Sequence, residues 1–249
     1  MLLTTQGIIL REVNYKESDK ILTLLTQEQG KLTASARGCR RKGSPLAAGS
    51  QLLVWSDFIL YEYQGRWSVK EAEVEREFRG MREDLDKFSL GCYFGEVTQA
   101  LALEGLPSPE LLSLILNSLH ALDRLDRPLA LVKGAFELRA MCLAGYEPVL
   151  DACAVCGCQP EEPRFHLREG VLHCARCRGE VGDGVSMPLD QGALAAMRHV
   201  AYGDPKRLFS FQLEEKSLSA FADVAEAYLL TQLERGFSTL DFYKSLRLS

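Results

Sequence analysis

The sequence lacks an excess of positive charge, since 29 Lys and Arg stand against 34 Asp and Glu and give a formal net charge of −5 over 249 residues. This balance excludes a protein that is uniformly coated with basic residues for nucleic-acid binding. The charge is nevertheless uneven. Residues 1–70 hold 10 cations and 6 anions, a balance of +4, whereas the other residues hold 19 and 28, a balance of −9. A polyanionic partner is therefore expected at the N-terminal segment.

Long apolar runs and a secretory signal are also missing. The longest apolar stretch without charge, Leu111–Leu122, is shorter than the roughly 20 residues that a membrane-spanning helix needs. The eight cysteines fall well below the roughly 8 to 10% of residues that marks a disulfide scaffold. We therefore expect a cytoplasmic protein without a membrane partner, whose cysteines are thiols or metal ligands.

The sequence contains none of the compact motifs that mark common catalytic sites. Gly-x-Ser-x-Gly, the Walker A motif, Gly-x-Gly-x-x-Gly and a helical pair of histidines at ligand spacing are all absent. The zinc-deaminase signature is absent too, because no His-x-Glu occurs. The four histidines are scattered, which is more typical of packed or exposed side chains than of a catalytic group: His120, His166, His173 and His199. The sequence therefore offers no recognisable catalytic constellation.

Apolar and β-branched runs separated by turn residues dominate the first 80 residues. In one run Tyr61 and Tyr63 alternate with Leu60 and Glu62, which is the period of a half-buried strand. The runs are Thr5–Val13, Ile21–Thr26, Lys31–Arg37, Leu52–Tyr63 and Trp67–Val74. Five short strands favour a small closed barrel over residues 1–79, because an open sheet of this size would leave its edges and one apolar face uncovered.

After Arg79 the apolar residues recur with the period of a helix, each stripe burying one face. The stripes are Leu90, Phe94, Val97 and Leu101, then Leu111, Ile115, Leu119 and Leu122, then Val132, Phe136, Ala140 and Leu143, followed by helical signal over Asp190–Ala201 and Lys216–Leu246. Residues 151–184 break this period and are flanked by helices on both sides. We therefore predict one helical domain, made of residues 80–150 and 185–249, with residues 151–184 as an inserted module. The fold class is α+β with several domains.

Two Cys-x-x-Cys pairs with 17 residues between them give the strongest chemical signal. This spacing lies inside the window that is typical of tetrahedral zinc. Gly157 supplies the positive φ that such a knuckle often needs, and a hairpin around residues 165–172 brings the second pair back to the first. Four thiolates leave no open coordination position, so we predict one structural zinc. The predicted ligands are Cys153, Cys156, Cys174 and Cys177.

Other interpretations of the cysteines remain open at this stage. The quartet can be simply reduced, or it can contain a redox pair. Cys158 and His173 lie close enough in sequence to act as substitute ligands. The isolated Cys39, Cys92 and Cys142 are interpreted as small, half-buried thiols.

A basic loop, residues 37–44, separates two predicted strands and gathers four cations among small and flexible residues. Such a loop on a barrel can neutralise a phosphate backbone, although a short basic run is often only a solvated loop. Aromatic side chains on the adjoining strands favour nucleic-acid binding, but most of them are expected in the barrel core. The cations are Arg37, Arg40, Arg41 and Lys42, and the aromatic residues are Trp55, Phe58, Tyr61, Tyr63 and Trp67.

The order and spacing of several short segments resemble the RecO family of bacterial recombination-mediator proteins over nearly the whole chain. These segments are Gly7–Leu10, Glu17–Lys20, Gln29–Lys31, Ala36–Gly38 with its basic continuation, Val69–Glu73, Gly145–Tyr146 before Cys153–Gly157, and Phe242–Leu246. The resemblance implies an N-terminal OB barrel, a helical domain and a four-cysteine zinc module.

The same resemblance implies a non-enzymatic function. It implies binding of single- and double-stranded DNA, annealing of complementary strands coated by single-stranded DNA-binding protein, and action with RecR so that RecA recombinase can load. Arg37, Arg40, Arg41 and Lys42 would then contact DNA. The chain is more acidic than the basic members of the family and lacks a Lys-rich C-terminal tail.

The resemblance also suggests a docking site for the acidic tail of single-stranded DNA-binding protein. We place this site at Lys133 and Arg139, which lie on a helix beside the apolar Phe136 and Leu143; an ordinary solvated face is the alternative.

A zinc-ribbon interaction module is another function class. It would need basic charge near the cysteines, but residues 151–184 hold 4 Arg against 6 acids. A hydrolase or redox enzyme would need an open metal site or a perturbed thiol pair.

Overall fold

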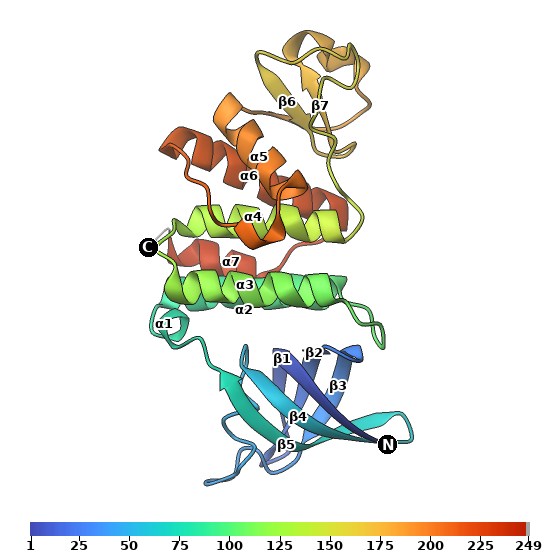
Figure 1. The fold of residues 1–249 in the computed structure, drawn as a ribbon, viewed down its shortest axis with the longest axis vertical. Helices are drawn as coiled ribbons and strands as arrows, with labels where there is room; N and C mark the ends of the chain where they lie inside the picture. Colours follow the sequence, from blue (N-terminus) through green and yellow to red (C-terminus); the bar gives the residue numbers. More distant parts are fainter. Residues whose placement is uncertain (248–249) are drawn as a thin grey trace. The chain divides into compact units, whose positions relative to one another are not determined.

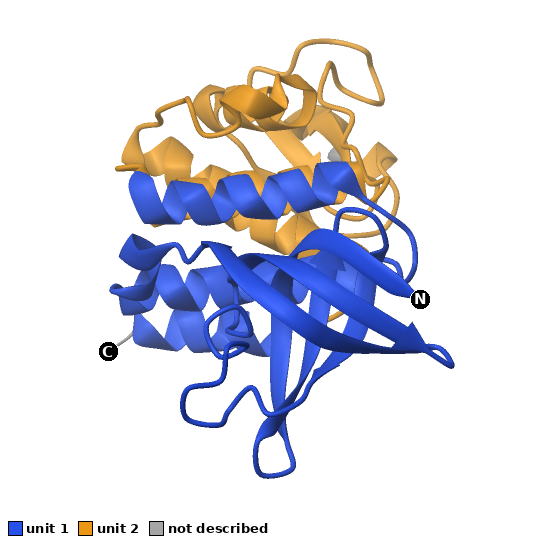
Figure 2. Ribbon diagram, turned by 60° about the horizontal axis from the view of Figure 1, so that its bottom comes forward, with its two compact units in different colours: residues 1–124, 237–249 blue, residues 125–236 orange. Residues whose placement is uncertain are grey.

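The computed structural model describes residues 1–247, except for the side chain of Arg178. Contacts divide the chain into two compact units, coloured separately in Figure 2. Unit 1 consists of Met1–Arg124 and Phe237–Ser249, and unit 2 consists of Leu125–Gly236. No helix within residues 1–247 is long and apolar enough to cross a membrane.

Unit 1 contains a closed barrel of five strands, which confirms the predicted barrel (Figure 1). The strands are β1 (Leu2–Tyr15), β2 (Asp19–Thr26), β3 (Gly30–Ala36), β4 (Trp55–Tyr63) and β5 (Arg66–Arg76). They close in the order β1-β2-β3-β5-β4. Neighbouring strands are antiparallel except for β3 and β5, which run parallel. Closure leaves no open sheet edge, so that a small sheet can bury one face completely.

Strand β4 shows how the sequence pattern builds the barrel core. Its Ser56, Phe58 and Leu60 are buried, whereas the alternate residues Tyr61 and Tyr63 beyond them are exposed. The core side chains come from all five strands and from the loop between β3 and β4: Ile9, Leu22, Leu24, Leu32, Ala34, Ala36, Cys39, Leu46, Phe58, Leu60 and Val69. Alternation of this kind fixes which face of each strand points inward.

The start of β4 differs from the sequence-based expectation. The strand begins at Trp55 instead of Leu52, because Leu53 has a positive φ of 59° and cannot continue an extended strand. The N–H of Leu53 donates instead to the carbonyl oxygen of Ile9 at 2.9 Å.

Unit 1 also contains the helices α1 (Arg79–Arg82), α2 (Leu85–Leu101), α3 (Pro109–Arg124) and α7 (Ser238–Leu246). Helix α2 begins after Asp84, whose carboxylate accepts a hydrogen bond from the Lys87 N–H. It packs against β1, α3 and α7. The Glu96 carboxylate on α2 accepts hydrogen bonds from the N–H and the hydroxyl of Thr239 and thereby holds the start of α7.

Unit 2 contains the helices α4 (Leu129–Leu143), α5 (Gln191–Tyr202) and α6 (Glu215–Leu233). Between α4 and α5 lies a small sheet of β6 (Pro163–His166), β7 (Val171–Cys174) and β8 (Ser186–Pro188), with the 3-10 helix η1 (Ala175–Glu180) after β7. A second 3-10 helix, η2 (Pro205–Arg207), follows α5. Strands β6 and β7 pair antiparallel, with Phe165 opposite Leu172, which confirms the predicted hairpin.

The helices are grouped differently from the single helical domain that the sequence suggested. The helical signal over Lys216–Leu246 is two helices, because α6 ends at Leu233 and Glu234 adopts a left-handed conformation with φ 49°. Helix α7 then packs in unit 1 and α6 in unit 2, where α6 lies against α4 and α5.

Candidate metal centre and nucleic-acid interface

The structure brings the two predicted cysteine pairs together in unit 2. The Sγ atoms of Cys153, Cys156, Cys174 and Cys177 all lie within 4.8 Å of one another. The first pair lies in the turn before β6, and the second pair spans the end of β7 and η1. Four thiolates at this spacing can hold one metal ion.

Backbone hydrogen bonds explain the shape of the first pair. The Gly157 N–H donates to the Cys153 carbonyl at 2.9 Å, and Gly157 has a φ of 72°, as predicted from the sequence. The Cys153 N–H donates to the carbonyl oxygen of Cys158 at 2.9 Å and closes the turn. The N–H of Cys174 donates to the Cys153 sulfur at 3.3 Å, so that the two pairs are joined directly.

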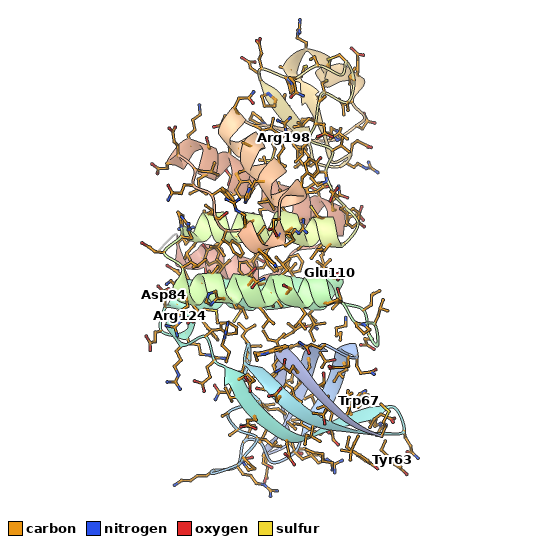
Figure 3. All side chains as sticks on the ribbon, in the orientation of Figure 1. Tyr63, Trp67, Asp84, Glu110, Arg124 and Arg198 are labelled. Carbon is orange, nitrogen blue, oxygen red and sulfur yellow. The ribbon has the colours of Figure 1, made fainter. Side chains whose placement is uncertain are left out.

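Arg198 on α5 holds the base of this turn, and the sequence analysis missed it (Figure 3). Its guanidinium donates to the carbonyl oxygens of Leu150 and Asp151 at 2.8 and 3.0 Å and to Gln159 Oε1 at 3.2 Å. Five donors in a planar fork suit such a set of acceptors. No pattern in the sequence distinguishes this arginine from an ordinary cation on a solvated helix face.

His173 is not available as a substitute ligand, which corrects one of the sequence-based alternatives. The side chain is buried, its Nδ1 lies 2.9 Å from the Cys174 carbonyl oxygen and its Nε2 lies 2.8 Å from Ser186 Oγ. Both ring nitrogens are therefore engaged. Cys158, by contrast, has its sulfur against the quartet.

The cysteines differ sharply in acidity. A hydrogen bond from the Cys158 backbone N–H is the main reason why the pKa of the exposed Cys156 thiol falls to about 6. Burial raises the pKa of Cys92 to about 11 and that of Cys142 to about 12. Burial also raises the pKa of Cys39. Within the cluster the directions differ: a hydrogen bond with the Cys158 thiol raises the pKa of Cys174, and burial raises that of Cys177 to about 11. Thiolate character therefore belongs above all to Cys156.

This difference predicts the order in which an alkylating agent modifies the metal-free protein. At pH 7 we expect iodoacetamide to modify Cys156 while Cys92 and Cys142 stay unmodified, because only a thiolate reacts. A pKa of about 6 means that the Cys156 thiol is mostly ionised at pH 7 and mostly protonated at pH 5. The rate of its alkylation should therefore be about tenfold lower at pH 5 than at pH 7. Peptide mass spectrometry of a time course measures both effects. Modification of Cys92 or Cys142 before Cys156 would contradict the prediction.

The basic loop follows β3 in unit 1, and all four of its cations are exposed: Arg37, Arg40, Arg41 and Lys42. Two apolar side chains of the segment between β3 and β4, Cys39 and Leu46, are buried in the barrel core at 3% and 8% exposure. Cys39 lies between Arg37 and Arg40, and Leu46 follows Lys42, so the loop is fastened to the barrel both within and after its run of cations. Its cations face solvent, while its buried side chains hold the backbone against the barrel.

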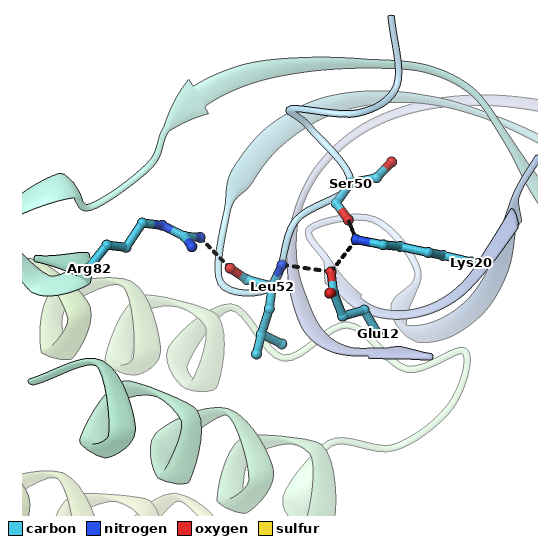
Figure 4. A network of polar contacts seen from close by, with 5 residues as sticks. All are labelled: Glu12, Lys20, Ser50, Leu52 and Arg82. Carbon is cyan, nitrogen blue, oxygen red and sulfur yellow. Dashed lines mark hydrogen bonds and ion pairs between the residues drawn. The ribbon is translucent and has the colours of Figure 1, made fainter. Parts of the chain in front are cut away.

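Polar contacts fix the two ends of the segment between β3 and β4. At its start, Asp19 accepts a hydrogen bond from the Gly38 N–H at 2.8 Å, and this bond is the main reason why the pKa of Asp19 is lowered. At its end, Glu12 accepts hydrogen bonds from Lys20 at 2.8 Å and from the Leu52 N–H at 3.1 Å (Figure 4).

The same network continues on both sides of Glu12. Lys20 also donates to the Ser50 carbonyl at 3.3 Å, and the Arg82 guanidinium donates to the Leu52 carbonyl. A carboxylate, two cations and three backbone groups thus hold the segment just before β4.

The aromatic residues near the loop are less buried than the sequence analysis expected. Of the five, Phe58 is fully buried, whereas Trp55 and Trp67 are half-buried. Tyr61 and Tyr63 are 37% and 61% exposed on the outer face of β4. The Lys70 ammonium lies 5.2 Å from the centre of the Tyr61 ring. The expectation that most of these side chains lie in the core is wrong, because Trp55, Tyr61 and Tyr63 alternate with the inward-facing residues of β4.

Tyr63 and Trp67 lie at the hairpin that joins β4 to β5 (Figure 3). Strand β3 pairs with β5 at Ala34 opposite Trp67 and Ser35 opposite Ser68. The basic loop begins directly after the part of β3 that pairs with the start of β5.

The predicted docking site at Lys133 and Arg139 is wrong in its geometry. Lys133 is 6% exposed and its ammonium lies 2.8 Å from Glu137 Oε1 and 2.7 Å from Glu226 Oε2. Burial acts to lower the pKa of this ammonium, but the two carboxylates outweigh it and raise that pKa. Arg139 is half-buried and donates to the carbonyl oxygen of Ala201 at 3.0 Å near the end of α5. Neither cation is presented to a peptide.

The chain matches two family models that together span most of its length. The model for the N-terminal part of recombination protein O matches residues 1–78, and the model for its C-terminal part matches residues 82–241. Both halves of the chain therefore indicate a recombination protein, whose N-terminal part contains the barrel.

Curated relatives agree over the full length. A protein named DNA repair protein RecO from Acetivibrio thermocellus is 34% identical over 247 residues, which cover 98% of this chain and 97% of the relative. Proteins of the same name from Symbiobacterium thermophilum and Bacillus subtilis are 32% and 30% identical and are covered over 98% and 88% of their lengths. The chain belongs to the RecO family.

Proposed function

We propose that this chain is a non-enzymatic mediator of DNA repair and recombination. It binds single- and double-stranded DNA through the barrel and anneals complementary strands. Together with RecR it helps to load RecA recombinase onto DNA that is coated by single-stranded DNA-binding protein. Membership of the RecO family, whose curated relatives are named DNA repair proteins, supports this proposal.

The observation that carries the DNA-binding step is the basic loop on the closed barrel of an otherwise acidic chain, which is fastened to the barrel and has all four of its cations exposed. Its Arg forks and its Lys ammonium neutralise phosphates and release counterions, which favours binding to any sequence. Tyr61 and Tyr63 supply exposed rings on which unpaired bases can stack. This combination suits single strands, and phosphate contacts alone suffice for duplex DNA.

The metal of the cysteine cluster is zinc in this proposal. Zinc–sulfur bonds of about 2.3 Å at the tetrahedral angle place neighbouring sulfurs about 3.8 Å apart. The Cys156 and Cys174 sulfurs are 3.7 Å apart, in agreement with such an edge. Four thiolate ligands leave no position for substrate or water, so zinc stabilises the residues around it without taking part in a reaction.

Strand annealing by the purified protein tests the proposed function most broadly. Two complementary strands, each coated with single-stranded DNA-binding protein, should pair faster in its presence, and the gain should rise with its concentration because the protein acts by binding. Gel shifts should show complexes with both single and double strands, with and without RecR. The absence of any complex and of any faster pairing, even with RecR present, would refute the proposal.

A further inference from the structure

A fifth cysteine touches the candidate zinc site. The Cys158 sulfur lies 3.1 Å from the Cys156 sulfur and 3.1 Å from the Cys174 sulfur. The Cys156 and Cys174 sulfurs are 3.7 Å apart, so Cys158 lies against the edge of the quartet that they form. The quartet itself is complete without it.

The geometry shows what Cys158 can do there. Zinc with thiolate ligands in a structural site is four-coordinate, with sulfurs about 3.8 Å apart. Both contacts of Cys158 are shorter than this edge, so Cys158 is not a ligand at the same time as both neighbours. Its sulfur lies instead beside the edge between these two neighbours, close enough to take a ligand position that becomes vacant.

We infer that Cys158 is an exchange ligand, which takes the place of Cys156 on the metal when Cys156 is lost or modified. This inference rests on the proposal that the cluster holds zinc. It adds to that proposal, because the site then has five thiols for four positions and tolerates the loss of Cys156.

The local backbone makes Cys156 the ligand that Cys158 can replace. Cys156 is exposed, whereas Cys158 is half-buried. The Cys158 carbonyl accepts the Cys153 N–H at 2.9 Å, so its backbone is tied to the base of the turn. Between the two lies Gly157, around which a Cβ would meet no atom within 4 Å. The tip of the turn therefore has space to move while Cys158 stays beside the metal.

The exchange needs no oxidant or reductant. One zinc–sulfur bond breaks at Cys156 and one forms at Cys158. The entering Cys158 thiol gives its proton to solvent. An intact Cys156 thiolate takes one up on leaving, whereas a modified Cys156 leaves as a neutral sulfur; in both cases the metal keeps four thiolates.

Four variants of the full chain test this inference: Cys156→Ser, Cys158→Ser, the double variant Cys156→Ser/Cys158→Ser, and Cys177→Ser as a matched control in the same module. Zinc is measured by elemental analysis after dialysis against a weak chelator. Cobalt substitution then counts thiolate ligands from the visible spectrum. Both readouts are independent of DNA binding.

Cys156→Ser and Cys158→Ser should each retain about one zinc and a four-thiolate cobalt spectrum. The double variant should bind zinc at least about tenfold more weakly, as should Cys177→Ser. If wild type holds zinc and Cys156→Ser loses it as fully as Cys177→Ser does, Cys158 is not an exchange ligand. If wild type itself holds no zinc, the proposed metal is wrong, and the two failures are thus distinguishable.

Discussion

Replacing Cys153 and Cys177 together by serine should abolish zinc binding and unfold residues 151–184 locally. Two of the four thiolates are then lost, and a single exchange ligand cannot restore the set. The strands of their sheet are only three and four residues long, so few backbone hydrogen bonds hold the sheet together without the metal. Small metal sites commonly draw much of their folding free energy from the metal, with apparent values of about 10 to 16 kcal/mol for zinc-finger peptides.

Hydrogen exchange measured by mass spectrometry locates this effect. Amides of β6 and β7 should exchange at least about a hundredfold faster in the double variant, whereas those of β1 to β5 should keep their protection. Chelation of the wild-type protein should reproduce the pattern. Cys158→Ser serves as the control, since it alters a thiol in the same turn and should leave protection unchanged. Wild-type protection of β6 and β7 in the metal-free double variant would contradict a structural role for the metal.

Replacing all four cations of the basic loop by alanine should weaken DNA binding at least about 25-fold at roughly 0.1 M salt, on every sequence alike. Each phosphate contact releases about 0.7 to 0.9 of a counterion, which raises the affinity about five- to eightfold at that salt concentration. We expect the loop to make two or three such contacts. Phosphates carry no base information, so the loss should not depend on sequence. The variant is Arg37→Ala/Arg40→Ala/Arg41→Ala/Lys42→Ala, and fluorescence anisotropy measures its affinity.

A second quadruple variant separates the position of the charges from their number. Arg168, Lys206, Arg207 and Lys216 are exposed cations of unit 2, and their replacement by alanine changes the net charge by the same amount. This control should bind DNA within about twofold of wild type. Zinc content and melting temperature should be unchanged in the loop variant, because its four side chains are exposed.

The barrel and the cysteine cluster could be predicted because their signals are local. Strand alternation fixes which residues of β4 face inward, and closure follows from the need to bury one face of a small sheet. Likewise, two Cys-x-x-Cys turns need only a hairpin between them to converge, and β6 and β7 form it. The positive φ of Gly157 follows from the same turn geometry.

Features that depend on packing between residues far apart in the chain could not be predicted from the sequence. Helix α4 was expected to bury one face, but Lys133 and Glu137 are buried along with the apolar residues because α5 and α6 both pack on it. Besides Glu137, Lys133 pairs with Glu226, which lies 93 positions further along the chain, and no local pattern predicts such an ion pair. Arg198 was missed for the same reason, since its acceptors are carbonyl oxygens of a distant turn.

The dependence of DNA affinity on salt shows whether the basic loop contacts the phosphates of DNA. Log affinity is measured against log salt concentration for the wild-type protein and the basic-loop variant on one single-stranded oligonucleotide, with RecR present or absent in parallel. The account predicts a slope that is shallower by roughly 1.5 to 2.5 in the variant, which corresponds to two or three lost phosphate contacts. Equal affinities and equal slopes for the two proteins would show that the basic loop is only solvated and that DNA does not bind there.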